Sequence, residues 1–352
     1  MLVAARPEFV VDGRAAAELG DRLVSLLAAE DDSGMARFEA RFANWGPLPG
    51  GGYGFLHDDR KLLDFGKALA VNWGGRALFS GRITALEGVF PAGGAPEFAV
   101  LAEDRLQDLR MARRTRTFLD GTDADAFRAV AAGHGLSAVL DLDGPKRPAL
   151  AQVNQSDLAF LRERARRLDA DVWIDGTALH AAVRSKRSAT AVALTWPGSV
   201  RSVAVTADLA TQRTSVTVSA WDPRTKAAAT HEATDSVLGS ESAGGDSGAT
   251  VLRRAFGTRP ETVAHRGPLD TGAARVEAEA AFRQMARRFV VARGVAEPDG
   301  RLRPGKPVAL AGLGPVFSGT FRLREVRHVF DDTDGQGLRT EFEAERPAIG
   351  RA

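Results

Sequence analysis

The sequence has no cysteine, no clear excess of charge of either sign and no long apolar run. The absence of cysteine among its 352 residues excludes a disulfide framework, a thiolate metal site and a cysteine nucleophile. Because 47 basic side chains nearly balance 45 acidic ones, no overall field selects a nucleic acid or an anionic membrane as partner. The apolar residues 189–196 are far too few to span a membrane, and residues 1–9 lack a signal-peptide pattern. We therefore expect a chain that folds in the cytoplasm and inserts in no membrane.

The length and the pattern near the N-terminus predict several domains that begin with strands. A chain of 352 residues usually needs two to three domains. In "ARFEARFA" (36–43) apolar and charged residues alternate, which predicts a half-buried antiparallel strand, with residues 22–30 as its hairpin partner. The glycine-rich segment 46–54 is expected to be an exposed loop.

The middle of the chain changes to helical spacing. A helix is expected from Asp123 behind a Thr122 cap, and a second helix behind a Ser156 cap. Asp175-Gly176 between two apolar runs predicts a hairpin. These elements indicate a small α+β unit between about residues 111 and 184.

Strand patterns then return in "SVAVTAD" and "TSVTVSAW". The stretch "GSESAGGDSG" from Gly239 is expected to be a flexible loop or linker. A third helix is expected from about Thr271 to Phe289, and the chain closes on the alternating strand "LRTEFEA".

Two distant stretches are similar: "GKALAVNWGGRALFSGRITALEGVF" from residue 66 and "GKPVALAGLGPVFSGTFRLREVRHVF" from residue 305. In both, the large apolar residues change from one strand face to the other midway, after Ile83 and after Leu323. The same change in two copies predicts a long bent strand with a bulge, as at a barrel corner. The repeat positions matched in this way are Gly66 with Gly305, Phe79 with Phe317, and Gly81 with Gly319.

A chance similarity of two amphipathic strands is the alternative. Lys67 precedes Phe79 by 12 residues and Lys306 precedes Phe317 by 11, and this near-equal spacing favours a duplicated barrel. Two copies are too few for a solenoid or a propeller.

No motif predicts catalysis or metal binding. The six histidines are scattered and none lies in an HExxH pattern. "HDD" (57–59) is expected to be a turn, "DDTDG" (331–335) lacks the glutamate that closes a calcium loop, and "GDSG" (245–248) has no matching histidine and aspartate signals. We therefore expect no catalytic residue, no cofactor and no metal site.

Several segments in order resemble a known family. They are "FSGRITALEGVFP" followed by "VLAEDRLQDLRMARRTRTF", then "QVNQSDLAFLRERARRLDADVWIDGTALH", "VTVSAWDPRTK" and the closing "VFSGTFRLREVRHVFDDTDGQGLRTEFEAER". The chain resembles the phage late control protein D family of baseplate hub proteins from contractile tails, which is similar in turn to the N-terminal hub portion of VgrG. The resemblance implies two barrels of the tail-tube type and smaller domains. It also implies a ring of three chains that presents six similar barrels.

The expected fold class is mainly β with α+β inserts: two tail-tube-like antiparallel β-barrels in tandem plus smaller α/β domains. The expected units are barrel 1 (1–108), an α+β insert (109–184), barrel 2 (185–230 and 296–352) and a helix-containing linker insert (231–295). Residues expected to face the lumen of the ring or neighbouring subunits are Arg37, Glu39, Arg339 and Glu341.

The resemblance implies a structural baseplate hub, not an enzyme, that adapts a sixfold tail tube to a threefold spike. Its implied partners are two further copies of itself, a hexameric tail tube protein, a trimeric spike protein, baseplate wedge proteins and a tape measure protein. A hub of this kind is assembled in the bacterial cytoplasm and becomes part of the particle. The alternatives are a spike or effector protein with a cell-wall-degrading activity and a tail-tube subunit. Because the sequence ends soon after "EAER", room for the hub alone is expected. The owner, whether phage, tailocin or injection system, stays open.

Overall fold

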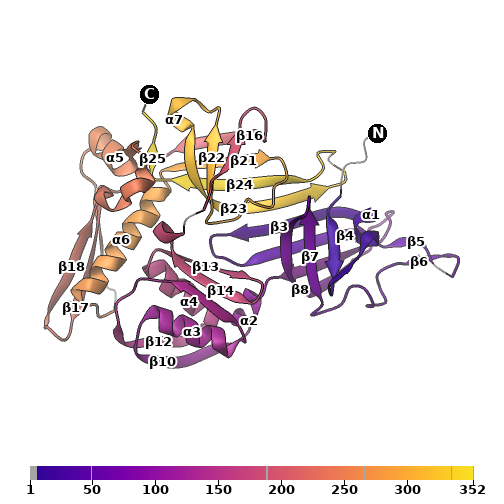
Figure 1. Ribbon diagram of the computed structural model, residues 1–352, viewed down its shortest axis with the longest axis horizontal. Helices are drawn as coiled ribbons and strands as arrows, with labels where there is room; N and C mark the ends of the chain where they lie inside the picture. The colour runs from indigo at the N-terminus through magenta and orange to yellow at the C-terminus, as the bar shows by residue number, and fades with distance from the viewer. Residues whose placement is uncertain (1–5, 49, 188, 265–266, 334, 352) are drawn as a thin grey trace.

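One large sheet of 13 strands connects the two ends of the chain (Figure 1). The structure is a computed structural model that describes residues 6–48, 50–187, 189–264, 267–333 and 335–351. In spatial order the main path of the sheet consists of β16 (Val200–Ala207), β21 (Val290–Ala296), β24 (Arg339–Arg346), β23 (Gly319–Asp331), β3 (Leu23–Asp31), β4 (Ala36–Ala43), β9 (Glu97–Glu103), β8 (Arg76–Val89), β7 (Ala68–Trp73), β1 (Glu8–Val11) and β2 (Arg14–Ala15). Off this path, β22 (Pro307–Ala311) pairs with β23 and, in parallel, with β15 (Val192–Thr195). The other ladders of the sheet are antiparallel.

The sheet has two halves with separate cores. The N-terminal half comprises β1–β4 and β7–β9 with the short helix α1 (Ala17–Asp21), and its core includes Phe9, Phe38, Phe42 and Phe79. The C-terminal half comprises β15, β16 and β21–β24, and its core includes Val290, Val308, Phe321 and Phe342. The halves meet where β3 pairs with β23. The expected fold class, mainly β with α+β inserts, is confirmed.

The N-terminal strand prediction is also confirmed. In β4 the side chains of Phe38, Ala40 and Phe42 are buried, while the intervening charged residues point away from the core. Its hairpin partner is β3, as the sequence predicted. The alternation therefore assigned this strand and its buried face correctly.

The first insert fills the chain between β9 and β15 with an α+β unit. Its elements are α2 (Leu106–Arg110), β10 (Arg113–Gly121), α3 (Asp123–Gly133), β11 (Ser137–Asp141), β12 (Arg147–Ser156), α4 (Asp157–Arg167), β13 (Ala170–Asp175), β14 (Ala178–Val183) and the 3-10 turn η1 (Arg184–Lys186). Thr122 caps α3 in a capping box with Asp125, and Ser156 caps α4. The predicted hairpin at Asp175-Gly176 joins β13 to β14. Local capping and turn signals therefore located these elements.

The second insert lies between β16 and β21. Its elements are β17 (Ser215–Asp222), β18 (Ala227–Ala233), η2 (Asp235–Ser242), β19 (Asp246–Ser247), α5 (Gly248–Phe256), β20 (Pro260–Val263) and α6 (Thr271–Arg287). β17 is the central strand of a three-stranded sheet with β18 and β20. The sheet packs against α6, where Val218 meets Ala274 and Phe282 in a shared core.

The expected boundaries around this insert need two corrections. The expected second barrel (185–230) includes β17 and the first part of β18, but these strands belong to the insert sheet. The expected insert (231–295) includes nearly all of β21, but this strand lies between β16 and β24 in the large sheet. The reason is that alternation shows that one face of a strand is buried and does not show whether a helix or another strand covers it.

Two segments expected to be irregular contain regular structure. Residues 239–248 were expected to form a flexible linker, but they include the end of η2, β19 and the start of α5. Residues 46–54 were expected to be a loop, but β5 (Trp45–Pro47) and β6 (Tyr53–Phe55) form a two-stranded hairpin there. Glycine-rich composition predicts a loop or linker, but within residues 46–54 Gly51 and Gly52 take positive φ in the turn between β5 and β6.

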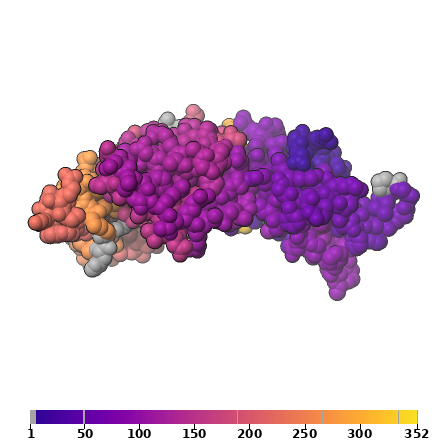
Figure 2. All heavy atoms as spheres, turned by 90° about the horizontal axis from the view of Figure 1, so that it is seen from below, coloured from indigo at the N-terminus to yellow at the C-terminus, as the bar shows by residue number. Residues whose placement is uncertain are grey.

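The molecule is elongated, and the inserts extend it at one side. Figure 2 shows the first insert over the middle of one face, the second insert at one end and the N-terminal half at the other. The chain is completed by α7 (Gly314–Phe317) and by β25 (Ala348–Ile349), which pairs with β19. Of the helices that the structure describes, none combines the length and the apolar character needed to cross a membrane.

Candidate assembly surface

Gly66 and Gly305 have the same role in the two halves. Each has a φ of +79°, a left-handed conformation that favours glycine. The Gly66 N–H donates to the carbonyl of Ile83 at 2.8 Å, and the Gly305 N–H donates to the carbonyl of Leu323 at 2.7 Å. Ile83 and Leu323 each donate back to the carbonyl of the lysine that follows the glycine. The two glycines therefore begin the same strand pair, β7–β8 in one half and β22–β23 in the other.

Phe79 and Phe317 do not occupy the same position, so this expected match is wrong. Phe79 lies inside β8, pairs with Val71 and is buried. Phe317 is the last residue of α7 and precedes β23. The similar letters fall at different places because the second copy forms a helical turn where the first copy is already extended.

The match of Gly81 with Gly319 is wrong for the same reason. Counted back from Ile83 and Leu323, which have the same hydrogen bonds, Gly319 takes the place of Phe79 rather than that of Gly81. Each glycine has its own local cause. A Cβ at Gly81 would collide with the carbonyl of Glu103, and Gly319 has a φ of +145°.

The long strands β8 and β23 bend at the same place. The β8–β9 ladder shifts register between Ile83 and Ala85, and the β23–β24 ladder shifts between Leu323 and Glu325. An extra residue in one strand moves the following side chains to the other face, as the change of face in the sequence predicted.

A second pair of bulges also recurs. The β3–β4 ladder shifts between Leu23 and Ser25, and the β16–β21 ladder shifts between Val200 and Ser202. The strand order β7-β8-β9-β4-β3 of one half corresponds to β22-β23-β24-β21-β16 of the other. We call these five strands the repeated unit, because order, direction and bulges agree in both halves.

The four residues expected at a lumen or a subunit interface share one face of the sheet. Residues directly opposite each other in antiparallel strands project to the same side. One such row across β4, β3, β23 and β24 is Arg37, Ala29, Arg327 and Glu341, and the next row is Glu39, Leu27, Val329 and Arg339. This face lies opposite the buried side chains of β4 and β24.

Mixed charges cover this face, which we call the charged face. Arg41 lies 3.4 Å from Glu39, Arg339 lies 3.3 Å from Glu341, and Arg293 lies 2.7 Å from Glu343. A hollow of about 560 Å³ lies on it over β16, β21, β24 and β23. Such partly exposed pairs contribute little stability, and their mixed sign gives no field that would select a polyanion.

The repeated units leave two strand edges open in the described part of the chain. β8 pairs with β7 only through Arg76–Arg82, so residues 84–89 have β9 on one side and no strand on the other. β16 pairs with β21 alone. Unpaired backbone N–H and C=O groups along such edges are able to add another strand.

Exposed aromatic side chains gather beside one of these edges. The rings of Trp45 and Phe55 on the β5–β6 hairpin lie 5.2 Å apart, and Phe55 lies 6.0 Å from Phe90, just after β8. All three side chains are exposed. Sequence reasoning missed this cluster, although large aromatics beside a glycine-rich segment were a usable signal.

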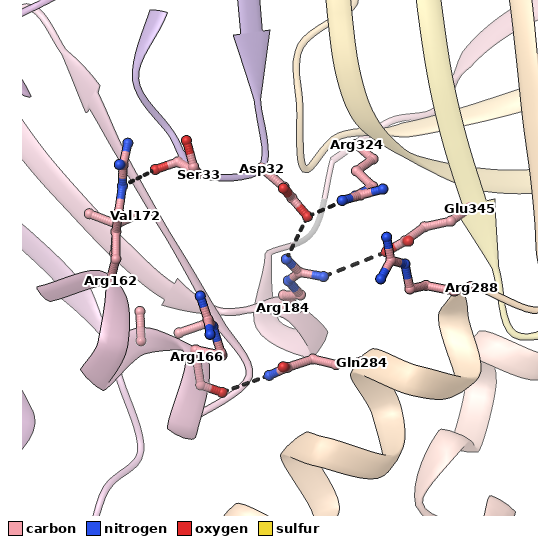
Figure 3. A pocket seen from close by; sticks show the side chains of 12 residues that line it. Asp32, Ser33, Arg162, Arg166, Val172, Arg184, Gln284, Arg288, Arg324 and Glu345 are labelled. Atoms are coloured by element: carbon pink, nitrogen blue, oxygen red, sulfur yellow. Dashed lines mark hydrogen bonds and ion pairs between the residues drawn. The ribbon is translucent and has the colours of Figure 1, made fainter. Parts of the chain in front are cut away.

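A cavity of about 340 Å³ lies where both inserts meet both halves (Figure 3). At its centre Arg184 of η1 donates to Asp171 at 2.9 Å and lies within 3.4 Å of Asp32 and 3.6 Å of Glu345. Burial by itself would raise the pKa of the Asp171 carboxyl. Its arginine neighbours Arg322, Arg184 and Arg187 outweigh burial and lower that pKa to about 2.

Other side chains around this cavity also bind one another. Arg324 contacts Asp32 at 3.3 Å and Glu343 at 2.8 Å. Arg162 donates to the Ser33 carbonyl at 2.7 Å, and Gln284 donates to the Arg166 carbonyl at 2.6 Å. These bonds link the inserts to the sheet and to each other, so the arrangement has a structural role.

The histidines lie in separate environments. Burial lowers the pKa of His57, which packs against Phe42, and lowers the pKa of His328 to about 3. His134 lies 2.8 Å from Asp157, and His180 stacks on Trp173. His231 pairs within the β17–β18 ladder, and His265 lies outside the described residues. Among the residues that the structure describes, no three His, Asp or Glu side chains form a group that could hold a metal ion.

The three suggestive motifs have local structural roles. Ser247 of "GDSG" donates to Asp235 at 2.7 Å and caps α5 by accepting from the Thr250 N–H at 3.0 Å. Asp59 accepts from the Lys61 N–H, and Asp331 accepts from the Thr333 N–H, as in polar turns. Asp334 of "DDTDG" lies outside the described residues.

Two solved structures with the same fold are tail proteins. A 43 kDa tail protein of prophage MuSo2 from Shewanella oneidensis is 13% identical with a TM-score of 0.72, covering 98% of this chain and 99% of that one. A tail protein from Neisseria meningitidis is 14% identical with a TM-score of 0.70, covering 97% of each chain.

A third structure comes from a secretion machine. It is an E. coli component of the type VI secretion system described as structurally similar to the T4 bacteriophage tail proteins gp27 and gp5. It is 14% identical with a TM-score of 0.54, covering 94% of this chain and 76% of that one. At these identities the likeness establishes the fold. No curated protein matches the chain.

A family model described as the Alg8 N-terminal domain matches residues 65–332. This range begins beside the first glycine of the repeated unit and ends just after β23, so it contains both inserts. The resemblance to late control protein D named another family, although the tail-protein fold that it implied is present. The chain belongs to the Alg8 N-terminal domain family and has the fold of phage tail proteins.

Proposed function

We propose that this protein is the structural baseplate hub of a contractile phage-tail-like machine. Three copies form a ring that adapts a sixfold tail tube to a threefold spike. This role corresponds to that of the late control protein D family and of the hub portion of VgrG. The protein then has no catalytic function and needs no cofactor.

The observation that carries this proposal is the repeated unit with its two open edges. Two similar units in one chain give six similar units in a trimer, because three chains each supply two. Such a ring offers approximate sixfold symmetry to a tube and true threefold symmetry to a spike. The similarity to tail proteins and to a type VI secretion component supports the same role.

The proposed partners follow from this position. A hexameric tail tube protein docks on one side of the ring and a trimeric spike protein on the other, with baseplate wedge proteins and a tape measure protein nearby. The ring is assembled in the bacterial cytoplasm and then belongs to the particle. The charged face lines the lumen or meets neighbouring subunits.

Co-expression with a trimeric spike protein from the same particle tests the stoichiometry. Light scattering and negative-stain images are expected to show three copies of each protein and a ring with a central channel. A stable complex of any other ratio, or six-membered rings of this chain alone, contradicts the proposal. The second outcome is expected for a tail-tube subunit.

A further inference from the structure

The two repeated units are joined within the chain by one strand pair. The outer part of β23, residues 325–331, pairs antiparallel with residues 31–25 of β3. β3 is the last strand of its repeated unit, while β23 is the long bent strand of the other. We call this strand pair the joint. It connects β3, the last strand of one repeated unit, with the part of β23 that follows the bulge in the other unit.

Only one such joint forms within a single chain. The strand equivalent to β3 is β16, and the part equivalent to outer β23 is the part of β8 after the bulge. These are the two open edges described above. The chain thus carries one complete joint and, separately, the two unjoined sides of a second one.

After its bulge, β8 has an exposed side where the equivalent side of β23 is buried. In β23 the side chains of Val326, His328 and Phe330 are buried, and Phe330 belongs to the core of the opposite half. Counted from the matching bulges, Phe90 takes the place of Phe330. Phe90 is 67% exposed, whereas Phe330 is 2% exposed.

The facing strand shows the same difference. In β3 the side chains of Leu26 and Ala28 are buried. Their equivalents in β16 are Val203 and Val205, which are only partly buried although they touch the core of the C-terminal half. Both sides of the second joint therefore have apolar side chains where a further strand would cover them.

We propose that β16 of one copy pairs antiparallel with residues 85–90 of a second copy of this chain. The register that follows from the first joint places Leu86 opposite Ala207, Gly88 opposite Val205 and Phe90 opposite Val203. Phe90 then enters the core of the partner's C-terminal half, as Phe330 enters the core of the N-terminal half. This proposal deepens the proposed function, since it names the contact through which the ring closes.

The two edges are compatible in charge and shape. In this register the one charged residue of the β8 segment, Glu87, lies opposite Thr206, so no like charges oppose each other. Arg201 is the one charged residue of β16, and its side chain donates to Glu297 at 2.8 Å and 2.9 Å. Pro91 ends the segment, because proline has no N–H for the ladder.

Each copy contributes one edge of each kind, so the contact is head to tail. Head-to-tail contacts form closed rings when the rotation between copies closes, and open filaments when it does not. In a ring, joints within chains alternate with joints between chains. A trimer then has six nearly equivalent joints around its circumference.

A disulfide tests the register directly, because the chain has no cysteine. The Asp332 N–H donates to the Val24 carbonyl, so every second pair from there exchanges hydrogen bonds and the pairs between do not. Val89 and Ala204 correspond to one of the pairs without hydrogen bonds, where Cβ atoms approach closely enough for a disulfide. Val89→Cys protein and Ala204→Cys protein are mixed and oxidised mildly, and the expected product is a covalent dimer.

Two matched mixtures control this experiment. Val89→Cys with Val205→Cys tests the neighbouring register position, whose side chain points to the other face. Val89→Cys with Ala193→Cys tests β15, a strand that pairs with β22 alone. Each control is expected to give less than about a tenth of the covalent dimer that Val89→Cys with Ala204→Cys gives. Equal yields, or no dimer from Val89→Cys with Ala204→Cys up to the solubility limit, overturn the proposal.

Hydrogen exchange on the unsubstituted protein gives a second readout. The amides of Leu86, Gly88 and Phe90 and those of Val203, Val205 and Ala207 are expected to become protected together as concentration rises. Unchanged exchange on association overturns the strand pairing. If the disulfide forms but the particle contains a number of copies other than three, the pairing stands and the proposed trimeric hub fails.

Discussion

Arg287 and Asp169 form a two-pronged ion pair that joins the two inserts. The guanidinium donates to the two carboxylate oxygens at 2.5 Å and 2.7 Å, and both side chains are almost completely buried. Burial disfavours the charge of Arg287, but its hydrogen bonds to Glu241 and Asp169 more than offset this and raise its pKa. Since α6 belongs to one insert and Asp169 precedes β13 in the other, the pair fixes two parts that share no sheet.

We expect Asp169→Asn to destabilise the fold by about 1.5–3 kcal/mol, because it removes one of the two carboxylates that pair with the buried Arg287 and leaves Glu241 as its remaining partner charge. The free energy of unfolding in urea measures this effect. Glu297→Gln breaks the more exposed pair with Arg201 and is the matched control, with little expected change. Equal effects of the two substitutions would contradict the role assigned to the buried pair.

His328 makes the free energy of unfolding depend on pH between about 3 and 6.5. Burial, and to a lesser degree Arg303, lower its pKa from 6.5 to about 3, while Asp299 acts weakly in the other direction. Because the folded pKa lies below the unfolded value, this stabilisation is complete above pH 6.5 and is lost as the pH falls towards 3. The expected loss between pH 6.5 and 5 is about 2 kcal/mol. Urea unfolding of His328→Leu at both pH values should show a smaller difference, and an unchanged difference would contradict this assignment.

Gly66 and Gly305 have the same φ of +79° but different surroundings, so the stability of their alanine variants can be compared. Gly66→Ala is expected to cost about 1–2 kcal/mol, because a Cβ is disfavoured at this φ but meets no neighbour there. Gly305→Ala should cost more, since its Cβ would collide with the side chain of Arg187 and displace it from Asp171. Urea unfolding of both variants measures the difference. A larger loss for Gly66→Ala would contradict the environments described.

Phe90 and Phe330 are expected to respond differently to truncation. Phe330→Ala should destabilise the monomer by about 3–5 kcal/mol, because it leaves a cavity in a core. Phe90→Ala should leave monomer stability unchanged and weaken self-association at least about tenfold, which corresponds to about 1.4 kcal/mol. Sedimentation of both variants, with thermal unfolding as a check of the fold, separates the two effects. Unaltered association of the Phe90 variant would show that this ring is not part of the contact.

Single cysteines at Arg37 and Glu341 distinguish a lumen from an interface. If the charged face lines the lumen, a small maleimide should label both Arg37→Cys and Glu341→Cys in the assembled particle as fast as in the monomer. A maleimide on a large polymer should label them only in the monomer. If assembly blocks the small reagent as well, the charged face lies between subunits.

The sequence determined those elements whose signals are local. Thr122 and Ser156 predicted helix starts, because a side-chain cap satisfies backbone N–H groups within three residues. The change of face after Ile83 and after Leu323 predicted two bulges, because the side-chain period of a strand is two and an extra residue must reverse it. The similarity of the two stretches also matched Gly66 with Gly305 correctly, and both glycines have a positive φ.

Only the tertiary structure decided which surfaces those elements cover. β17 and β21 each bury one face, yet β17 packs under α6 and β21 joins the large sheet, because burial of a face does not specify its cover. Phe79 and Phe317 lie in similar sequences, yet Phe79 lies inside β8 and Phe317 is the last residue of the helical turn α7. The pairing of β3 with β23 joins residues about 300 positions apart. No local pattern encodes such a pairing, because it depends on which strand edges remain free once both repeated units have folded.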